Sequence, residues 1–413
     1  MARIFPFQPY RYTQAAAVAL DHLVTQPYDK IYPDMRERYL SLSPYNLVRI
    51  ILGKPQPTDS ASDNIYTRGA AHLNDWIAKG VLAREAEPSF FAYFQEFRDP
   101  DSGETLVRKG FIGLGQVEEY SAGIVHRHEQ TLSGPKKDRL EVLRHTHAHF
   151  GQIFMLYPDK EGAVDRILDA AAAQAPLGVV TDEYNGVHRL WKISDPATVA
   201  EVQRLMGDKK LVIADGHHRY ETALNFSKES SLADAQRVMM TFVNMYSPGL
   251  RILATHRLVK NLDGFEAQAM LEKLGTLGTL APIDEAAFRQ RFASFEDGKV
   301  LMGVALPDGI RLLEAPRAKG DLDVRFLHQR VLEGVLGIGE EAVREEKYLQ
   351  YVRGLDGALA AVRGGKAQVG FLLQPTRIDE VADVSFGGGV MPQKSTDFYP
   401  KLLSGMTIYR LEQ

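Results

Sequence analysis

The sequence Leu211-Val-Ile-Ala-Asp-Gly-His-His-Arg219 joins a short apolar run to a cluster of polar and charged residues. The apolar run predicts a buried strand, and Gly216 indicates the turn that ends it. Beyond the turn, Tyr220, Ala223 and Leu224 have the spacing of one buried helix face. Ligands of open α/β sheets bind where a strand ends and a helix begins, so this turn is the first candidate site.

A bound phosphate suits this turn, which consists of Asp215, Gly216, His217, His218 and Arg219. The free N–H groups and the positive dipole end of a helix favour an anion. Basic side chains at this position need a counter-charge, which a phosphate supplies while it accepts hydrogen bonds from Arg219. The alternative is a packed turn in which Arg219 pairs with Asp215. We favour function, because five such residues are clustered at one strand–helix junction.

The segments around this turn predict a mixed α/β protein. Phe90–Phe97 and Thr105–Leu114 flank a turn and predict a hairpin. The Ala-rich stretch Val164–Gln174 predicts a helix. Asp195 and Pro196 are a good N-cap and first-turn pair for a second helix. We therefore expect an α/β fold of mixed α+β character.

Composition excludes several classes of protein. The 413 residues suggest two or three domains and include no Cys, which rules out a disulfide framework, a thiolate nucleophile and a Cys-ligated metal. A net charge of -4 argues against nucleic acid as a partner. We find no apolar run long enough for a signal peptide or a membrane span, so we expect a cytoplasmic protein without membrane contact. A homo-oligomer remains an open alternative.

A second cluster of polar residues lies at His126, His128 and Glu129. On a strand the two histidines share one face, and Glu129 points to the other. The sequence lacks the second His of a His-Glu-x-x-His zinc helix, because position 132 is Leu. Two interpretations stay open: Glu129 is a catalytic carboxylate beside a basic loop, or the cluster is an exposed, charged strand end.

Three further histidines, His145, His147 and His149, follow a charged stretch. On a helix His145 and His149 share a face and have the spacing of metal ligands. Carboxylates at ligand spacing do not follow them, so we favour a polar, partly buried face over a metal site.

The C-terminal segment combines Gly387–Gly389 with Lys394, Ser395 and Thr396. It approaches the P-loop pattern, but Gln393 stands in place of the second Gly, and a neighbouring Pro disfavours the usual strand–loop–helix course. Backbone amides, one Lys and two hydroxyls still suit an anion. The alternative is a surface loop.

Several motifs occur in order along most of the chain. They are Pro27-Tyr28-Asp29, His128-Glu129 with Thr131, Lys137-Asp138-Arg139, Asp215–Arg219 with Tyr220, Thr255-His256-Arg257, Met391-Pro392 with Lys394-Ser395-Thr396, and Phe398-Tyr399-Pro400-Lys401. With these motifs the chain resembles a bacterial family catalogued as domain of unknown function 1015.

A narrower resemblance concerns Val187–Leu224, which looks like the ParB/sulfiredoxin-type nucleotide-binding fold. In that fold a Gly-x-x-Arg turn holds nucleotide phosphates, and here the turn would run from Gly216 to Arg219. Sulfiredoxin chemistry needs a Cys that this chain lacks, and the DNA-binding features of ParB proteins are not evident. Proteins that phosphorylate free L-serine carry a similar Asp-Gly-His-His-Arg turn, so this branch is the best relative.

The resemblance implies a domain plan. Residues 1–120 would form an N-terminal α+β region, and residues 121–260 a ParB/sulfiredoxin-like nucleotide-binding core embedded in a larger mixed-sheet protein. Residues 261–413 would form a C-terminal α/β region that contributes a terminal loop to the site.

The resemblance also implies a nucleotide-dependent small-molecule kinase that phosphorylates the hydroxyl of free L-serine or a similar metabolite, using ATP or ADP with Mg²⁺. Asp215 or Glu129 would accept the hydroxyl proton or bind Mg²⁺, and His218 would donate to the transferring group. The expected cofactor-binding residues are Gly216, His217, Arg219, Lys394, Ser395 and Thr396. Two alternatives are a nucleotide-binding regulatory switch without turnover and a phosphate-ester hydrolase with a metal near His145–His149.

Overall fold

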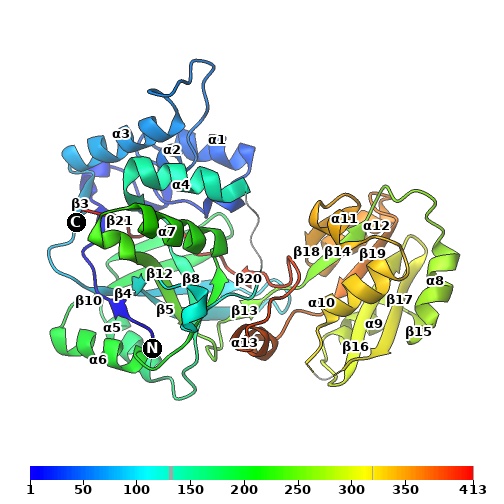
Figure 1. The fold of residues 1–413 in the computed structure, drawn as a ribbon. Helices are drawn as coiled ribbons and strands as arrows, with labels where there is room; N and C mark the ends of the chain where they lie inside the picture. Colours follow the sequence, from blue (N-terminus) through cyan, green and yellow to red (C-terminus); the bar gives the residue numbers. More distant parts are fainter. Residues whose placement is uncertain (130–133, 319, 413) are drawn as a thin grey trace.

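The structure of the protein is a computed structural model that describes residues 1–129, 134–318 and 320–412. Thr131, which belongs to one of the family motifs, lies outside the described residues. The chain forms two lobes, each built on its own sheet (Figure 1). We call them the main lobe and the second lobe.

The main lobe contains a mixed sheet of nine described strands in the order β6-β11-β8-β12-β5-β4-β10-β9, with β1 paired to β5. The pairs β6–β11 and β8–β12 are parallel, and the other pairs are antiparallel. The strands are β1 (Ile4–Phe5), β4 (Phe90–Arg98), β5 (Thr105–Gln116), β6 (Val125–His126), β8 (Ile153–Tyr157), β9 (Gly178–Thr181), β10 (Val187–Ile193), β11 (Leu211–Asp215) and β12 (Arg237–Asn244).

Helices cover both faces of this sheet (Figure 1). On one face α5 (Ala163–Ala172) packs on β4, β5 and β10, and α6 (Pro196–Met206) packs on α5. On the other face α7 (His217–Glu229) packs on β8 and β12, and α4 (Gly134–Thr146) packs on α7. Burial of apolar side chains drives this layering, and Leu168 and Met206 are fully buried in the core beneath the sheet.

The remaining α-helices and strands of the main lobe lie outside its large sheet. They are α1 (Pro33–Leu42), α2 (Val48–Ile51), α3 (Ile65–Ala78), and the strand pairs β2 (Tyr10–Tyr12) with β3 (Leu82–Arg84), β7 (Ala148–His149) with β21 (Tyr409–Arg410), and β13 (Arg251–Ile252) with β20 (Phe398–Tyr399).

The predicted elements around the first candidate site are confirmed. The hairpin is β4 and β5, the Ala-rich helix is α5, and the buried strand and the helix after it are β11 and α7. At the start of α6, the Asp195 carboxylate accepts a hydrogen bond from the backbone N–H of Thr198 at 2.9 Å, as expected for an N-cap. These features depend on residues that are close in sequence.

The second lobe contains six described strands in an antiparallel sheet, in the order β15-β17-β16-β19-β14-β18. Its strands are β14 (Thr255–Val259), β15 (Thr279–Ile283), β16 (Lys299–Leu306), β17 (Gly309–Pro316), β18 (Leu349–Arg353) and β19 (Val369–Leu373). Its helices are α8 (Ala267–Gly275), α9 (Glu285–Phe292), α10 (Asp323–Phe326), α11 (Glu340–Arg344) and α12 (Leu355–Arg363).

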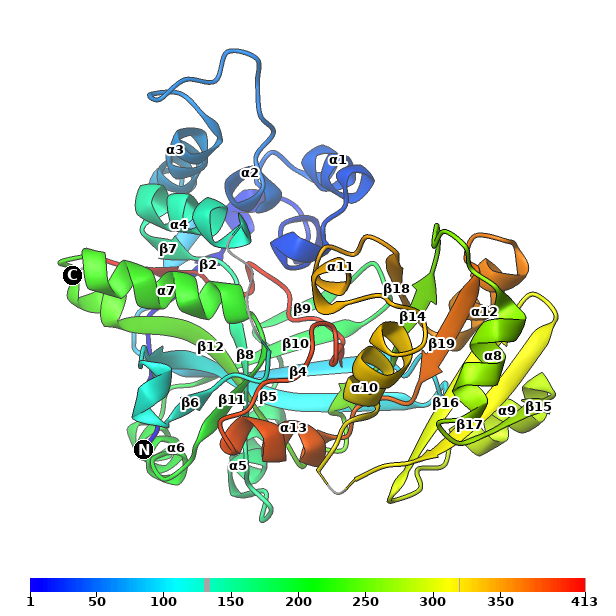
Figure 2. The same cartoon turned by 45° about the vertical axis from the view of Figure 1, so that its right-hand side comes forward.

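The chain crosses from one lobe to the other twice. After the second lobe, α13 (Ile378–Phe386) contacts β11, and the C-terminal segment returns to the main lobe (Figure 2). There β20 pairs with β13. The expected boundary at residue 120 does not separate two sheets, because β5 before it pairs with β12 after it. No described helix is long and apolar enough to cross a membrane.

Candidate functional site

A cavity of about 500 Å³ lies where β11 ends and α7 begins. Its wall comes mainly from the segments 26–32, 182–184, 215–219, 351–353 and 394–401, which are far apart in sequence. The segment 351–353 belongs to β18 of the second lobe, so both lobes contribute to the cavity. The volume is within the range typical of small-molecule sites.

Asp215 is the anionic centre of this cavity. Its carboxylate accepts hydrogen bonds from Arg219 Nη2 at 2.8 Å and from Lys401 Nζ at 3.2 Å. Burial alone would raise the pKa of Asp215, but Lys401, Arg219 and Lys30 together hold it well below its usual value. Asp215 is therefore an ionised ligand for cations and a weak base.

The pairing of Arg219 with Asp215 is the alternative that the sequence left open. Asp215 engages Arg219 through Nη2. Arg219 nevertheless lines the cavity, so pairing and contact with a ligand are compatible. The Arg219 guanidinium packs closely against two glycines. If Gly216 carried a Cβ, this atom would lie 3.0 Å from Arg219 Nε, and a Cβ at Gly151 would lie 3.1 Å from Arg219 Nη1.

A second ion pair extends this network toward the second lobe. Lys401 Nζ lies 3.2 Å from Asp397 Oδ1, and Asp397 also accepts from Arg353 on β18. Burial would raise the pKa of Asp397, but Lys401, Arg353 and Lys30 lower it. Burial lowers the pKa of Lys30, and Lys401 lowers it further. The cavity thus alternates cationic and anionic groups.

The N-terminus of α7 faces this network. Gly216 precedes the helix with a φ of 94°, a left-handed conformation that favours glycine, and as the N-cap residue it offers no side chain to cap the helix. His217 and His218 line the cavity in the first turn. First-turn amides without a side-chain cap suit an anionic group of a ligand.

Glu129 also lines the cavity and is hydrogen-bonded to the C-terminal segment. Its Oε1 accepts a hydrogen bond from the backbone N–H of Lys394 at 2.5 Å. Burial raises the pKa of Glu129, and Asp215 raises it further, although the Lys394 N–H and the Lys394 and Lys401 charges oppose this shift. Asp215 and Glu129 therefore have pKa values displaced in opposite directions.

Next to Glu129, the fully buried His128 connects β11 with the C-terminal segment. Its Nδ1 lies 2.7 Å from the Ile213 carbonyl, and its Nε2 lies 2.7 Å from Thr396 Oγ1. Burial lowers the pKa of His128 to about 4, so the ring is neutral near pH 7. The carbonyl only accepts, which assigns the proton to Nδ1 and leaves Nε2 to accept from the Thr396 hydroxyl.

One predicted site residue, Ser395, does not line the cavity. Lys394 and Thr396 line the cavity, but Ser395 between them points away, and its hydroxyl donates to the Pro392 carbonyl. Gln393 and Lys394 form a turn in which Lys394 has a φ of 57°, and this turn directs the Lys394 side chain and the Ser395 hydroxyl differently. The predicted role of Ser395 in cofactor binding therefore has no geometric support.

Two buried arginines hold the C-terminal segment through its backbone. Arg108 donates to the carbonyls of Tyr399 and Pro400, and Arg257 donates to the Lys394 carbonyl at 3.0 Å. Burial lowers the pKa of Arg108 to about 9 and that of Arg257 to about 10. These contacts position Lys394 and Lys401 at the cavity.

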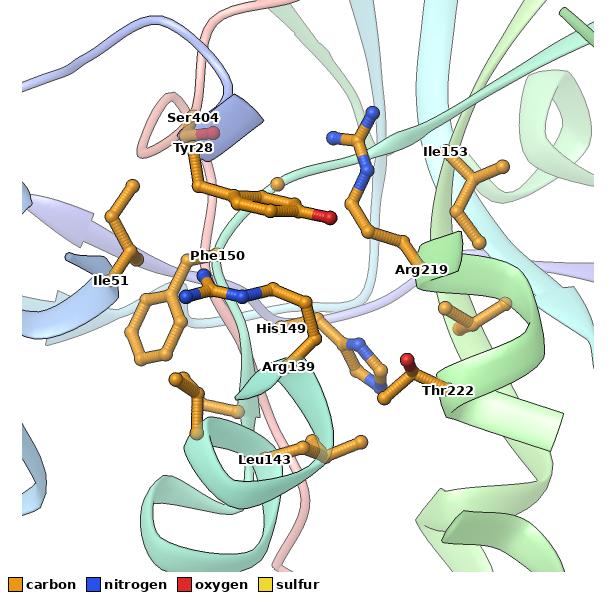
Figure 3. A pocket seen from close by; sticks show the side chains of 14 residues that line it. Tyr28, Ile51, Arg139, Leu143, His149, Phe150, Ile153, Arg219, Thr222 and Ser404 are labelled. Carbon is orange, nitrogen blue, oxygen red and sulfur yellow. The ribbon is translucent and has the colours of Figure 1, made fainter. Parts of the chain in front are cut away.

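A smaller cavity of about 70 Å³ adjoins the large one and shares Tyr28 and Arg219 with it. Figure 3 shows the Tyr28 ring between Arg139 and Arg219. The Arg139 guanidinium lies 4.1 Å from the centroid of this ring, a cation–π contact. His149 also lines this cavity, and burial lowers its pKa to about 4.

The three histidines considered as a metal site have different surroundings. His145 stacks on Tyr66, His147 packs near Phe226, and His149 stacks on Tyr409. Among the residues that the structure describes, no group of three or more His, Asp or Glu side chains is arranged to hold a metal ion.

Sequence reasoning gave no role to several cavity residues. Lys30, Asp182 and Arg353 line the cavity, but none of them belongs to a motif that we recognised in the sequence. Asp397 and Lys401 are next to or within a family motif, but only the fold brings them to Asp215.

The fold and the cavity define a mixed α/β protein with a charged site between two lobes. Its sequence matches the family described as "Protein of unknown function (DUF1015)" over residues 4–333. The chain therefore belongs to the DUF1015 family. No curated protein gives a significant match.

The chain is also distantly similar to solved structures. A free serine kinase in complex with AMP has 12% sequence identity and a TM-score of 0.38, covering 70% of this chain and 88% of its own. A mutant of a free serine kinase in complex with ADP has 12% identity and a TM-score of 0.38, covering 70% and 89%. SbnI from Staphylococcus aureus, truncated at its C-terminus, has 12% identity and a TM-score of 0.36, covering 71% and 87%.

Proposed function

We propose that this protein is a nucleotide-dependent phosphotransferase that moves a terminal phosphoryl group to the hydroxyl of a small molecule. One observation carries the proposal. The cavity combines the N-terminus of α7 with cationic side chains and with two carboxylates, Asp215 and Glu129, whose pKa values are displaced in opposite directions. Phosphoryl transfer needs positioning and charge neutralisation more than covalent chemistry from the protein.

The phosphates of ATP or ADP would bind at the first turn of α7. The backbone there offers N–H groups, and Arg219 and Lys394 offer positive charge from two sides of the cavity. His217 and His218 add ring nitrogens beside the transferring group. Mg²⁺ is commonly held by one or two carboxylates together with substrate phosphates, and Asp215 fits that part because it stays ionised.

Glu129 is the better candidate for the base that accepts the hydroxyl proton. A general base works best when its pKa approaches the working pH, and burial moves the pKa of Glu129 in that direction. Asp215 has the opposite shift and is already paired with two cations. The two carboxylates that the sequence treated as alternatives therefore receive different roles.

Free L-serine is the first acceptor to test, because the Asp215–Arg219 motif resembles that of serine-phosphorylating proteins. The protein is incubated with Mg-ATP or Mg-ADP and L-serine, and O-phosphoserine is measured by mass spectrometry. A panel of other small alcohols follows under the same conditions. Product with any of them supports the phosphotransferase.

Two variants test the roles. Arg219→Ala should abolish nucleotide binding measured by calorimetry, whereas Glu129→Gln should retain binding and lower turnover by about 100-fold or more. Arg204→Ala on the exposed face of α6 is a matched control, because Arg204 forms its ion pair with Glu201 of the same helix and lies outside the cavity wall. Normal nucleotide binding by Arg219→Ala would contradict the placement of the phosphates.

A regulatory switch without turnover is the second candidate, and the hydrogen bond from the Lys394 N–H to Glu129 favours it. This contact closes the C-terminal segment over a carboxylate, and a bound nucleotide would compete with the contact. Nucleotide binding without product from any acceptor would support the switch. Metal-dependent release of phosphate from a simple ester would instead support a hydrolase.

A further inference from the structure

The hydroxyl of Thr396 has the hydrogen-bonded surroundings of an activated nucleophile. Its Oγ1 lies 2.7 Å from His128 Nε2, and the other ring nitrogen of His128 lies 2.7 Å from the Ile213 carbonyl. A nucleophile within reach of a base, and a base oriented by a third group, form the arrangement that activates hydroxyls in covalent catalysis.

The hydrogen bond to His128 determines what Thr396 offers to the cavity. Because its single O–H points to His128, the oxygen presents only lone pairs to a ligand. Thr396 lines the large cavity together with Gly216 and Lys394, which are expected to lie near the phosphates. An electron-rich oxygen therefore faces the same space as the proposed nucleotide.

A second observation beside this pair points to a ligand. The His217 ring packs edge-on against the His128 ring, with centroids 4.7 Å apart and an angle of 74° between their planes. His217 is 7% exposed, and its Nε2 has no hydrogen-bond partner among the described residues. A buried polar atom without a partner needs an explanation, and an oxygen atom of a phosphoryl group on Thr396 would satisfy it.

We propose that Thr396 is itself a phosphoryl acceptor, modified on Oγ1 by the terminal phosphoryl group of a nucleotide bound in the same cavity. The proposal rests on the proposed function, because it requires a bound nucleotide. It adds a covalent site on the protein that the transfer to a small molecule does not require.

The chemical step is balanced within the site. The Thr396 oxygen forms a bond to the terminal phosphorus, and the bond from this phosphorus to the bridging oxygen breaks. The nucleotide leaves with one phosphate fewer. The hydroxyl proton passes to His128 Nε2 and then to an oxygen of the transferred group. Since burial disfavours the charged ring, His128 returns this proton readily. A loose transition state demands little nucleophilic push from the hydroxyl.

The test uses the full chain and no acceptor. The protein is incubated with Mg²⁺ and ATP or ADP carrying a labelled terminal phosphate, quenched in acid, digested and mapped by mass spectrometry. We expect up to one acid-stable phosphoryl group per chain, on Thr396. An acid-labile label would instead indicate a histidine or a carboxylate and would overturn the proposal.

Four variants test the roles of Thr396 and His128. Thr396→Val should lose the label and Thr396→Ser should retain it, so that loss of folding cannot explain the result. His128→Gln should slow labelling, because it removes the ring nitrogen that orients the Thr396 hydroxyl and accepts its proton; a base with a pKa of about 4 contributes less than one with a pKa near the working pH. Ser395→Ala is the matched control, because its hydroxyl points away from the cavity and the label should remain.

The outcomes separate this proposal from the function on which it rests. Nucleotide binding and product formation from a small acceptor, without label on Thr396, would overturn the proposal and leave the phosphotransferase intact. A protein that binds neither ATP nor ADP would overturn both. A phosphoryl label that persists unchanged in Thr396→Val would show that the label lies on another residue and would overturn the proposal.

Discussion

Lys401 Nζ lies 3.2 Å from Asp215 Oδ1, although the two residues are 186 positions apart in the sequence. This ion pair fastens the C-terminal segment to the turn between β11 and α7. Burial would lower the pKa of Lys401, but Asp215, Asp397 and Asp29 raise it, so Lys401 remains charged. The pair therefore connects the stability of the returning segment to the integrity of the cavity.

The first prediction concerns this pair. Lys401→Met should lower the free energy of unfolding by about 1.5–3 kcal/mol, the usual range for a lost hydrogen bond between charged groups with limited exposure. The same change should weaken ATP binding at least 10-fold, because it removes positive charge and loosens the segment that carries Lys394. Urea unfolding and calorimetry measure the two effects.

A matched control is Lys228→Met, which removes a lysine from an exposed pair with Glu119 on the surface. Exposed pairs contribute about 0–1 kcal/mol, so this variant should unfold nearly as the wild type does. Equal losses in the two variants would show that the Lys401 contact has no special role.

Local sequence patterns predicted the part of the site that is contiguous. The strand, turn and helix from Leu211 to Leu224 follow from apolar spacing and from Gly216, and both depend on neighbouring residues. Long-range pairings were not predictable in this way. The sequence could not show that β5 pairs with β12, and so the boundary expected at residue 120 does not separate two sheets.

The residues of the candidate site were likewise predictable only where they are close in sequence. Lys394 and Thr396 were predicted from residue type, but the direction of each side chain depends on the turn at Gln393 and Lys394, after which the Ser395 hydroxyl donates to the Pro392 carbonyl. Arg353 comes from the second lobe and reaches the cavity only through the packing of the two lobes. Residues brought together by tertiary contacts carry no periodic signal in the sequence.

The second prediction concerns the pH dependence of turnover. Glu129 must be ionised to act as a base, and its pKa is raised, first by burial. Activity should therefore rise with pH along a limb whose midpoint lies above the usual Glu value of about 4.3. Glu229→Gln, on the surface of α7, should keep this limb. A limb at or below pH 4.3 would exclude Glu129 as the base.

The third prediction concerns stability in acid. Burial lowers the pKa of His256 to about 4, and its ring accepts a hydrogen bond from the Leu373 N–H at 3.2 Å. In the unfolded chain the pKa is about 6.5, so the unfolded state binds more protons between these values. The stabilisation is fully present above pH 6.5 and is lost as the pH falls toward 4, by up to roughly 3 kcal/mol.

Urea unfolding at several pH values tests this expectation. The slope of the free energy of unfolding between pH 6.5 and 4 should be smaller in His256→Asn than in the wild type. His22→Asn is the control, because His22 is exposed and should keep the wild-type slope. An unchanged slope in His256→Asn would mean that this histidine does not titrate differently in the two states.

The last prediction tests how the backbone of the C-terminal segment tunes Glu129. Arg257 is almost fully buried and donates to the carbonyls of Thr255 and Lys394, so that it holds Lys394 where its N–H reaches Glu129. Arg257→Lys replaces the two separate guanidinium nitrogens that hold these carbonyls by one ammonium nitrogen, which does not match the positions of both. The Lys394 N–H then moves away from Glu129. Since this N–H lowers the pKa of Glu129, its loss should raise that pKa further.

The acid limb of the activity profile of Arg257→Lys should consequently move to higher pH. The free energy of unfolding should fall by about 1–3 kcal/mol, because one carbonyl is left without a donor. Arg344→Lys, at an exposed position of α11, should change neither quantity. A loss of stability with an unmoved limb would mean that Arg257 only supports the fold. If the acid limb moves and nucleotide binding is retained, Arg257 of the second lobe sets the pKa of Glu129 in the main lobe. A change in unfolding alone does not displace the midpoint of a pH profile.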